Sequence, residues 1–539
     1  MRKSLFNFIV IALTTVAITT DTCDAERYRT KIAILGAGAA GISAASRFNQ
    51  KGETDFLIVD AQPFIGGRVQ HQSFGDYSVE LGANWIYGKG ANPIYKLATL
   101  HELVTTPNDK RDVVYFDSHG SVPTQVGHEL ADAFEQVMEN MVLYAEDRLS
   151  RNQVDLSSRT ALRMLNWKPD THLKSAVEYF AIDWELAEPA DGCSLDYATG
   201  TRDMTVGTFP FGNEFVIDNR GFNYILQQEA RHCLRGNDDR LLLNTLVTHI
   251  DYSGTDGLVK IKTNNSHEIV ADYVLCTFSL GVLQSDLVHF IPEFPEWKKE
   301  ALYSFHMTTY MKIFMRFDHQ FWGDWQFALY ADNNGTKPDS GYTVWQNLNA
   351  PGYFSFLQSN KEKKEKRHNN ILMVTVTHKD AERIERMVDT EIMDEIMVVL
   401  QKMFPDITIP RPLEILVPRW HNNPLFRGSY SNWPIGMQTE HHDNLRAPLP
   451  INHPRVWFSG EAMSDDYGYL HGAWTEGIAT ANKILDCIRS RCPREDYHEN
   501  ITGCGNSPTF KFHNTNKKKN ASTFSSTSAS ISLVFHREQ

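Results

Sequence analysis

The segment "KIAILGAGAAGISAASRF", residues 31–48, carries a strong signal for one kind of fold. An apolar run from Ile32 to Leu35 leads into a glycine-rich turn, and the alanine-rich segment after the turn favours a helix. Glycines allow the backbone to approach a pyrophosphate, and the first turn of a helix presents free N–H groups and the positive end of its dipole. This strand–turn–helix unit therefore predicts a dinucleotide-binding site.

A carboxylate at the expected distance supports the same prediction. The segment "DFLIVDA", residues 55–61, reads as the next strand and leads to Asp60, nineteen residues after Gly41. A carboxylate at this point of a dinucleotide fold binds ribose hydroxyls. The two motifs leave open whether the dinucleotide is NAD or FAD.

Length and composition indicate an ordinary soluble protein with room for two domains. The chain has 539 residues, of which 42% are hydrophobic and 22% are charged. Its formal net charge of −13 argues against nucleic acid as a partner, because a phosphate-binding surface needs an excess of basic residues.

The N-terminus has the layout of a secretory signal peptide. Arg2 and Lys3 precede an apolar run, and small residues follow at Cys23 and Ala25. We expect residues 1–25 to be removed and the protein to be secreted, to the extracellular space or cell wall, with no membrane span after cleavage. A signal anchor is the alternative, although the run is short for a span. Glycosylation sequons fit secretion and begin at Asn264, Asn334, Asn500 and Asn520.

The cysteines predict one disulfide and no metal site. Cys487, Cys492 and Cys504 lie close together in sequence, and an oxidising compartment favours a bridge among them. Cys276 lies in an apolar run and is expected to be a buried free thiol. The sequence has no CxxC pair or HExxH motif, so we expect no metal.

Two kinds of segment alternate along the chain, which predicts two interleaved domains. Strand-like runs with glycine turns suggest a dinucleotide-binding domain, and helices with 3.6-residue periodicity, such as 126–150 and the one beginning near Asp389, fall between them. The composition after Cys504 predicts a disordered tail, and the run "KEKKEKR" at 361–367 a solvated surface. The expected pieces are 30–109, 207–290 and 433–490 for the first domain, 110–206 and 291–432 for the second, and 505–539 for the tail.

The choice between NAD and FAD follows from further motifs. In "PFIGGRVQ", residues 63–70, glycines again permit close approach to a pyrophosphate and Arg68 can neutralise it. Together with "VELGANWIYG" at 79–88 and "VWFSGEAMSDDYGYLHGAW" at 456–474, this segment resembles the FAD-dependent amine oxidase family, which includes monoamine and polyamine oxidases. Asp60 stands where the family more often has Glu, and His71 where it often has Ser or Thr.

The resemblance spans about residues 30–490 and is closest to plant and fungal polyamine oxidases. "ADYVLCTFSLGVLQSDL", "YMKIFMRF", "LVPRW" and "GSYSNWP" occur in the family's order. The implied fold combines α/β and α+β elements: a Rossmann-like FAD-binding domain is interleaved with a substrate-binding domain, a mixed sheet flanked by helices. A generic flavoprotein with two dinucleotide sites is the alternative.

The resemblance also implies how FAD is held. The cysteine that carries FAD covalently in monoamine oxidases has no counterpart, so the flavin should be noncovalent. The residues that match the family's cofactor-binding positions are Gly36, Gly38, Ala39, Ala40, Gly41, Asp60, Gly67, Arg68, Gly82, Ala83, Asn84, Trp85, Val247, Glu461, Tyr469 and Leu470.

One lysine is the candidate catalytic residue. Lys312 lies inside the apolar run "YMKIF", where burying a lysine is costly without a purpose or a partner. By resemblance it contacts flavin N5 through a water molecule. Tyr430 and Tyr469 match the two aromatic positions that flank the substrate, and Tyr310 is a further substrate-binding candidate.

The substrate implied by the resemblance is a polyamine such as spermine or spermidine, with dioxygen as the final oxidant and hydrogen peroxide as a product. Glu185 in "DWELAEP" matches a tunnel carboxylate of plant enzymes, and Glu188 is a second carboxylate nearby. Tyr87 stands where plant enzymes tend to have a glutamate, which puts the plant binding mode in doubt. The alternatives are oxidation of a monoamine, an acetylated polyamine or an L-amino acid, or a flavin-binding protein without turnover. The bond attacked and the oligomeric state stay open.

Overall fold

The glycine-rich stretch forms the predicted strand–turn–helix unit. Strand β1 (Arg27–Leu35) leads into helix α1 (Ala39–Gln50). Gly36 has φ +114°, and a Cβ at Gly41 would lie 1.9 Å from the carbonyl oxygen of Gly36. The turn therefore needs glycine at both positions, one for its backbone conformation and one for the close packing of the helix.

The computed structural model describes residues 26–199, 209, 212–236, 238–331, 341–353, 370–490 and 492–501. The expected signal peptide, the expected tail and the charged run 361–367 lie outside these residues, as do Asn334 and Asn520. Those predictions stay predictions.

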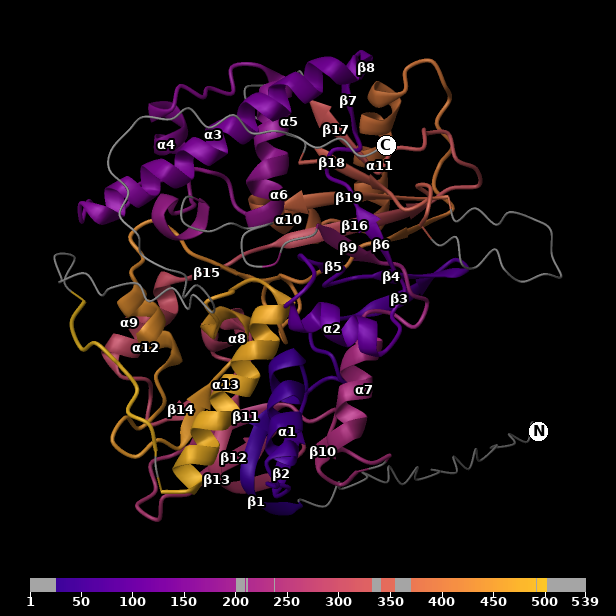
Figure 1. Ribbon diagram of the computed structural model, residues 1–539. Coiled ribbons are helices and arrows are strands. Elements are labelled where there is room, and N and C mark those ends of the chain that lie inside the picture. The colour runs from indigo at the N-terminus through magenta and orange to yellow at the C-terminus, as the bar shows by residue number, and fades with distance from the viewer. Residues whose placement is uncertain are drawn as a thin grey trace, which may run out of the picture. The chain divides into compact units, whose positions relative to one another are not determined.

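A mixed eight-stranded sheet carries the dinucleotide motif. Strand β1 pairs in parallel with β2 (Phe56–Val59) and β13 (Glu268–Cys276), and β13 pairs in parallel with β22 (Val456–Phe458). Helices α1, α7 (Asn223–Cys233) and α13 (Leu470–Ile488) lie together beside this sheet (Figure 1). The remaining strands are β10 (Leu241–Leu242), β11 (Val247–Asp251), β12 (Val259–Thr263) and β14 (His289–Ile291).

A seven-stranded sheet, in the order β20-β16-β19-β18-β17-β7-β8, takes its strands from two other parts of the chain. They are β7 (Val113–Asp117), β8 (Gly120–Val122), β16 (Tyr310–Arg316), β17 (Phe327–Ala331), β18 (Val344–Asn347), β19 (Ile371–Thr377) and β20 (Glu414–Leu416). The predicted helices are confirmed as α3 (Thr124–Ser150) and α11 (Asp389–Met403), which pack near β7. The mixed sheets and flanking helices confirm the expected fold class, and the division into two domains stays a prediction.

Shorter elements join the two large sheets. A three-stranded sheet has the order β5-β9-β6, and β3 pairs with β4. The bounds are β3 (His71–Phe74), β4 (Tyr77–Glu80), β5 (Trp85–Ile86), β6 (Thr105–Asn108), β9 (Asn213–Val216), β15 (His306–Met307), β21 (Ser431–Asn432), α2 (Pro93–Leu100), α4 (Ser158–Met164), α5 (His172–Ala181), α6 (Asp183–Leu186), α8 (Leu280–Leu283), α9 (Glu296–Ser304), α10 (His378–Glu385) and α12 (Thr439–Arg446).

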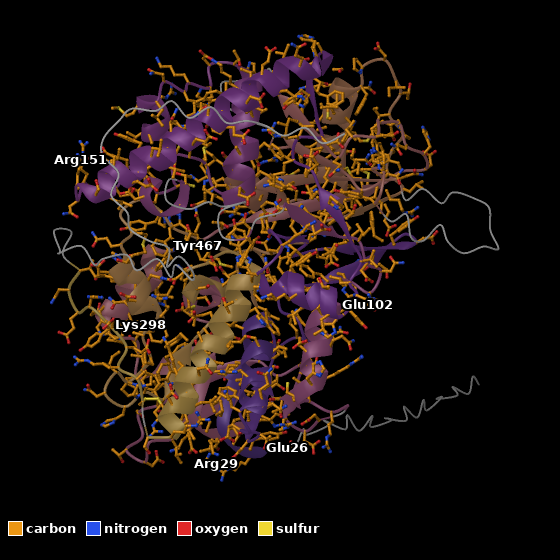
Figure 2. The ribbon with its side chains drawn as sticks, viewed as in Figure 1. Glu26, Arg29, Glu102, Arg151, Lys298 and Tyr467 are labelled. Atoms are coloured by element: carbon orange, nitrogen blue, oxygen red, sulfur yellow. A yellow bond between two sulfur atoms is a disulfide. The ribbon has the colours of Figure 1, made fainter. Side chains whose placement is uncertain are left out.

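A buried lysine fastens helix α9 to the C-terminal end of helix α12. Lys298 on α9 (Figure 2) donates from Nζ to the carbonyl oxygens of Asn444, Leu445 and Ala447 at 3.1, 3.0 and 2.8 Å. The last carbonyls of a helix lack partners within the helix, so this ammonium caps α12. Burial lowers the pKa of Lys298 well below its ordinary value.

Two of the cysteine predictions are confirmed. Cys487 and Cys492 form a disulfide at the end of α13, and Cys276 is a buried free thiol. Among the helices in the described part of the chain, none is long and apolar enough to cross a membrane.

Candidate active site

One cavity brings almost all of the predicted site residues together. It has a volume of about 290 Å³, and its lining comes from both large sheets and the elements that join them. The exceptions are Gly41, whose missing side chain serves the packing of α1 instead, and Glu188. The predicted residues that line the cavity are Gly36, Gly38, Ala39, Ala40, Asp60, Gly67, Arg68, Gly82, Ala83, Asn84, Trp85, Tyr87, Glu185, Val247, Tyr310, Lys312, Tyr430, Glu461, Tyr469 and Leu470.

The part of the cavity at helix α1 fits a dinucleotide. Gly38 precedes the first turn of α1 and supplies no side-chain cap, so the helix N-terminus can receive a phosphate instead. The Cα of Gly38 would lie 3.2 Å from a Cβ at Gly67, so the two glycine turns approach each other through bare backbone. Asp60 accepts hydrogen bonds from the backbone N–H of Ala37 at 2.6 Å and of Gln62 at 2.7 Å. These contacts hold the carboxylate in the cavity wall, where a ribose would meet it.

An ion pair joins the second glycine motif to the last one. Arg68 Nη1 lies 2.9 Å from Glu461 Oε1 and donates to the carbonyl oxygen of Ser429 at 2.8 Å. The other oxygen of Glu461 accepts hydrogen bonds from Ser431 Oγ at 2.7 Å and from the backbone N–H of Gly468 at 2.8 Å. Glu461 thereby fixes three separate segments around the cofactor site.

Lys312 is buried, as its position in an apolar strand predicts. Residues alternate between the faces of β16, and Tyr310 and Lys312 therefore share the face that lines the cavity. Lys312 Nζ donates to the carbonyl oxygens of Glu80 at 3.1 Å and Gly82 at 2.6 Å, and lies 4.9 Å from the ring centroid of Trp85. Burial lowers the pKa of the Lys312 ammonium, and the Glu80 carboxylate opposes this shift.

Four tyrosines surround the remaining part of the cavity. The ring centroids of Tyr310 and Tyr430 lie 5.8 Å apart, and those of Tyr87 and Tyr469 lie 4.9 Å apart. Burial, with a smaller contribution from the charge of Glu185, raises the pKa of Tyr87 well above its ordinary value. The phenol of Tyr87 is therefore neutral at physiological pH and offers a substrate its ring faces and its hydroxyl.

Glu185 lies in the cavity wall, but it already has a cationic partner. Its Oε2 lies 2.8 Å from Lys110 Nζ, and Tyr469 donates its hydroxyl to Oε1 at 3.4 Å. Tyr430 donates its hydroxyl to the backbone oxygen of Glu185 at 2.9 Å. The expectation that the Glu185 carboxylate binds only the substrate is therefore incomplete.

Glu188, the second carboxylate named from the sequence, is a structural residue. It lies 2.6 Å from His306 Nδ1 and accepts a hydrogen bond from Asn432 Nδ2 at 2.7 Å, and it does not line the cavity. The ion pair with Glu188 raises the pKa of His306. The exposed His306 and the buried Asn432 therefore occupy the carboxylate for which the sequence indicated no definite role.

Sequence reasoning missed three residues of the site. The backbone oxygen of Glu80 accepts a hydrogen bond from Lys312. Glu80 lies in the motif "VELGANWIYG", so the sequence contained a signal for this residue. Trp184 packs edge-on against Trp85, with the ring centroids 5.5 Å apart. The sequence pattern around it indicated a role only for its neighbour, Glu185. Lys110 lies in the charged turn "NDKRD", which reads as solvated surface and gives no signal.

Comparison with known proteins agrees with this geometry. The chain is 36% identical to polyamine oxidase 1 of Zea mays over 493 residues, covering 86% of this chain and 91% of that protein. It is 37% identical to polyamine oxidase 7 of Oryza sativa subsp. japonica over 469 residues, covering 84% and 94%. A structure of wild-type putrescine oxidase bound to putrescine has the same fold, with a TM-score of 0.65 at 16% identity, covering 85% of this chain and 99% of that one.

The family itself is shown by the extent of the match. Residues 39–485 match the family described as flavin-containing amine oxidoreductase. This range includes the helix that follows the first glycine turn, Lys312 and the tyrosines of the cavity. The protein is thus an FAD-dependent amine oxidase, and it belongs to the family of flavin-containing amine oxidoreductases.

Proposed function

We propose that the protein is a secreted oxidase of polyamines of the spermine and spermidine type. FAD, when bound, supplies the redox chemistry: it accepts a hydride equivalent from the carbon beside the amine nitrogen and passes the electrons to dioxygen, which becomes hydrogen peroxide. The resulting imine hydrolyses to an aldehyde and a shorter amine. The protein binds and orients the amine and keeps competing reactions away.

The observation that carries the proposal is a buried carboxylate among aromatic rings in the same cavity as Lys312. The Glu185 side chain is only 4% exposed, so it can hold a distal ammonium in a partly desolvated place. The rings of Tyr87 and Tyr469 add the faces that attract a cation. Near Lys312, the rings of Trp85 and Tyr310 remove water from the reacting nitrogen, which favours the neutral amine that can be oxidised.

An L-amino-acid oxidase is the alternative that the charges argue against. Such an enzyme needs a cation for the substrate carboxylate. The arginine among the described cavity residues is Arg68, and it is already paired with Glu461. Lys312 already donates to backbone oxygens.

A peroxide assay tests the proposal. The purified holoenzyme is mixed separately with spermine, spermidine, a monoamine and an L-amino acid, and hydrogen peroxide is measured. We expect the highest specificity constants for the polyamines. Peroxide from the L-amino acid or the monoamine but not from the polyamines would contradict the proposed substrate class. Identifying the amine products gives the bond that is broken.

Secretion is supported by features at several places in the chain. The Cys487–Cys492 disulfide suits an oxidising compartment, and the sequon residues Asn264 and Asn500 are exposed. Expression in a eukaryotic host tests this part. We expect a secreted protein that starts near residue 26 and loses mass on treatment with an N-glycosidase. Retention inside the cell with an intact N-terminus would contradict it.

A further inference from the structure

The Glu185 carboxylate is the centre of a complete binding site for an alkylammonium group. Lys110 Nζ lies 2.8 Å from Oε2, 4.9 Å from the ring centroid of Trp184 and 5.9 Å from that of Tyr87. An anion and aromatic faces together are the surroundings that bind organic cations. The end of a lysine side chain is itself a primary alkylammonium, the same group that ends a polyamine.

Lys110 can leave this place without a change of the backbone. It lies in the turn between β6 and β7, and its side chain is 27% exposed. Asp109 fixes the turn independently, because its carboxylate accepts the backbone N–H of Arg111 at 2.8 Å and its own N–H donates to Gln326 Oε1 at 3.0 Å. The four-carbon stem can therefore rotate toward solvent while the turn stays in place.

We propose that Lys110 determines substrate specificity by competing with the distal ammonium of the substrate for Glu185. This inference rests on the proposed function, since only an amine with a second charge meets the competitor. A polyamine has to displace Lys110 before it can pair with Glu185, whereas a monoamine does not use this place. Lys110 therefore lowers the preference for long polycations relative to short amines.

The test compares Lys110→Met with the wild-type holoenzyme over a monoamine, a diamine, spermidine and spermine. Methionine keeps an unbranched apolar stem and removes the charge. We expect KM for spermidine and spermine to fall about threefold to fivefold, the upper range of one partly solvated ion pair, while kcat and the monoamine constants stay within about twofold. The gain should shrink at high salt and disappear in a Lys110→Met/Glu185→Gln double variant.

Lys174 provides the matched control. It pairs with Asp170 at 2.7 Å and lies 5.9 Å from the ring centroid of Trp167, which is the same kind of arrangement outside the cavity. Lys174→Met should leave all four constants unchanged. Equal changes for all four amines in Lys110→Met, or weaker binding of spermine alone, would overturn the role of Lys110.

A binding measurement separates this inference from the proposed function. Calorimetric titration of the holoenzyme with its flavin reduced beforehand and dioxygen excluded measures spermine binding without turnover. Tighter spermine binding by Lys110→Met supports the competition even if the wild-type protein produces no peroxide from polyamines, a result that would contradict only the proposed function. Unchanged spermine binding in Lys110→Met overturns the inference whatever the activity.

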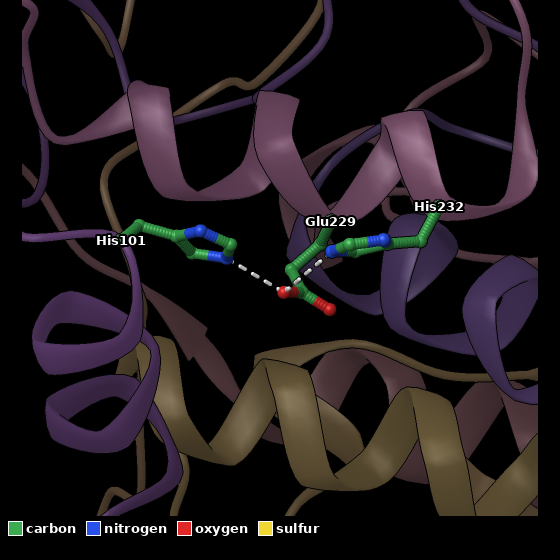
Figure 3. A group of neighbouring side chains, drawn as sticks. All are labelled: His101, Glu229 and His232. Carbon is green, nitrogen blue, oxygen red and sulfur yellow. Dashed lines mark hydrogen bonds and ion pairs between the residues drawn. The ribbon is translucent and has the colours of Figure 1, made fainter.

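A second, independent group of side chains lies between helices α2 and α7, outside the cavity (Figure 3). His101 follows α2, and Glu229 and His232 lie three residues apart on α7. Glu229 Oε1 lies 2.8 Å from His101 Nε2 and 3.9 Å from His232 Nε2, and all three atoms are within 4.8 Å of one another. Both imidazole nitrogens therefore approach the same oxygen of Glu229, and the three atoms form one compact group (Figure 3).

The surroundings of Glu229 favour a cation there. Its side chain is 10% exposed, and its ion-pair partners in the described part of the chain are the two imidazoles. Zinc accepts imidazole nitrogen and carboxylate oxygen in a tetrahedron whose ligand atoms are about 3.4 Å apart, a spacing between the 2.8 and 3.9 Å of the two histidine–glutamate pairs. We propose that His101, Glu229 and His232 bind Zn²⁺ with water as the fourth ligand, a site that the search for sequence motifs did not anticipate.

Calorimetric titration of tag-free holoenzyme with zinc chloride tests this site. We expect one equivalent to bind, with binding lost in His101→Ala and in Glu229→Gln, which keeps both imidazoles. The exposed His453 provides a matched control, and His453→Ala should bind zinc as the wild type does. No binding by the wild type, or equal binding by the wild type and a His101→Ala/His232→Ala double variant, would overturn the site.

Discussion

Lys312 is the residue on which the activity should depend most directly. Its Nζ is held by backbone oxygens against the ring of Trp85, so it presents a fixed hydrogen-bond donor to the cavity, although burial lowers its pKa. A preorganised donor of this kind contributes on the order of 10² or more to the rate of a step that develops charge. We expect Lys312→Met to slow turnover by about that factor while FAD content stays unchanged. Stopped-flow traces of flavin reduction and reoxidation measure the effect.

The control for this variant is an exposed strand lysine. Lys262 lies on β12 and faces solvent, so Lys262→Met should leave both rates unchanged. If Lys312→Met and Lys262→Met behave alike in both half-reactions, Lys312 has no part in the chemistry.

Lys298 offers a test of stability, because its neighbour provides a matched comparison. Lys298→Met leaves three carbonyl oxygens at the end of α12 without their donor, which costs about 1–3 kcal/mol for a buried polar group. Lys299 is a surface lysine paired with Glu293, so Lys299→Met should change the free energy of unfolding by less than about 0.5 kcal/mol. Chemical denaturation of both variants measures the difference. Equal losses would show that Lys298 does not cap α12.

The pKa of Lys298 adds a pH dependence with a defined sign. Burial lowers the pKa of Lys298 in the folded state, so above that pKa and up to the ordinary lysine value the unfolded chain binds more protons. The free energy of unfolding therefore gains a contribution that rises with pH in this interval. Lys298→Met should remove this rise, which denaturation at a series of alkaline pH values measures. The same slope in the wild type and the variant would contradict the assignment.

The position of helix α1 depends on the absence of a side chain at Gly41. A Cβ at Gly41 would meet the Gly36 carbonyl oxygen at 1.9 Å, so Gly41→Ala must push α1 away from the glycine turn. We expect a stability loss of about 1–3 kcal/mol and a clear loss of bound FAD, measured by thermal unfolding and flavin absorbance. Gly236→Ala is the control, since a Cβ there meets no atom within 4 Å. Full FAD content in Gly41→Ala would show that the turn tolerates the shift.

The elements differ in how far the sequence could predict them. The glycine turn, β16 with Lys312, and helices α3 and α11 follow from local patterns that their surroundings do not override. Lys298 and Lys299 are adjacent in sequence, and which of them is buried depends on how α9 lies against α12, which no local pattern contains. The Lys110–Glu185 pair joins residues 75 positions apart, and nothing in the turn around Lys110 distinguishes it from solvated surface.

The whole molecule should carry its flavin without a covalent bond. The described residues that line the cavity include no cysteine, the residue to which covalent flavins attach in related oxidases. We expect the purified protein to be yellow and acid to release FAD into the supernatant. Flavin that stays with the precipitated polypeptide would contradict this. Removing FAD should also lower the thermal unfolding temperature, because a ligand that binds only the folded state stabilises it.

The ion pair between Arg68 and Glu461 can form only late in the synthesis of the chain. The two residues are 393 positions apart, so a ribosome that adds about 5–20 residues per second makes the second one about 20–80 seconds after the first. Strand β22, which completes the sheet beside β13, is also among the last elements to be made. The nascent chain therefore presents an open phosphate-binding turn for most of its translation, and FAD is captured only after the C-terminal segment has folded back. A shortage of FAD would therefore leave finished chains without their cofactor, and these chains are less stable than the holoenzyme.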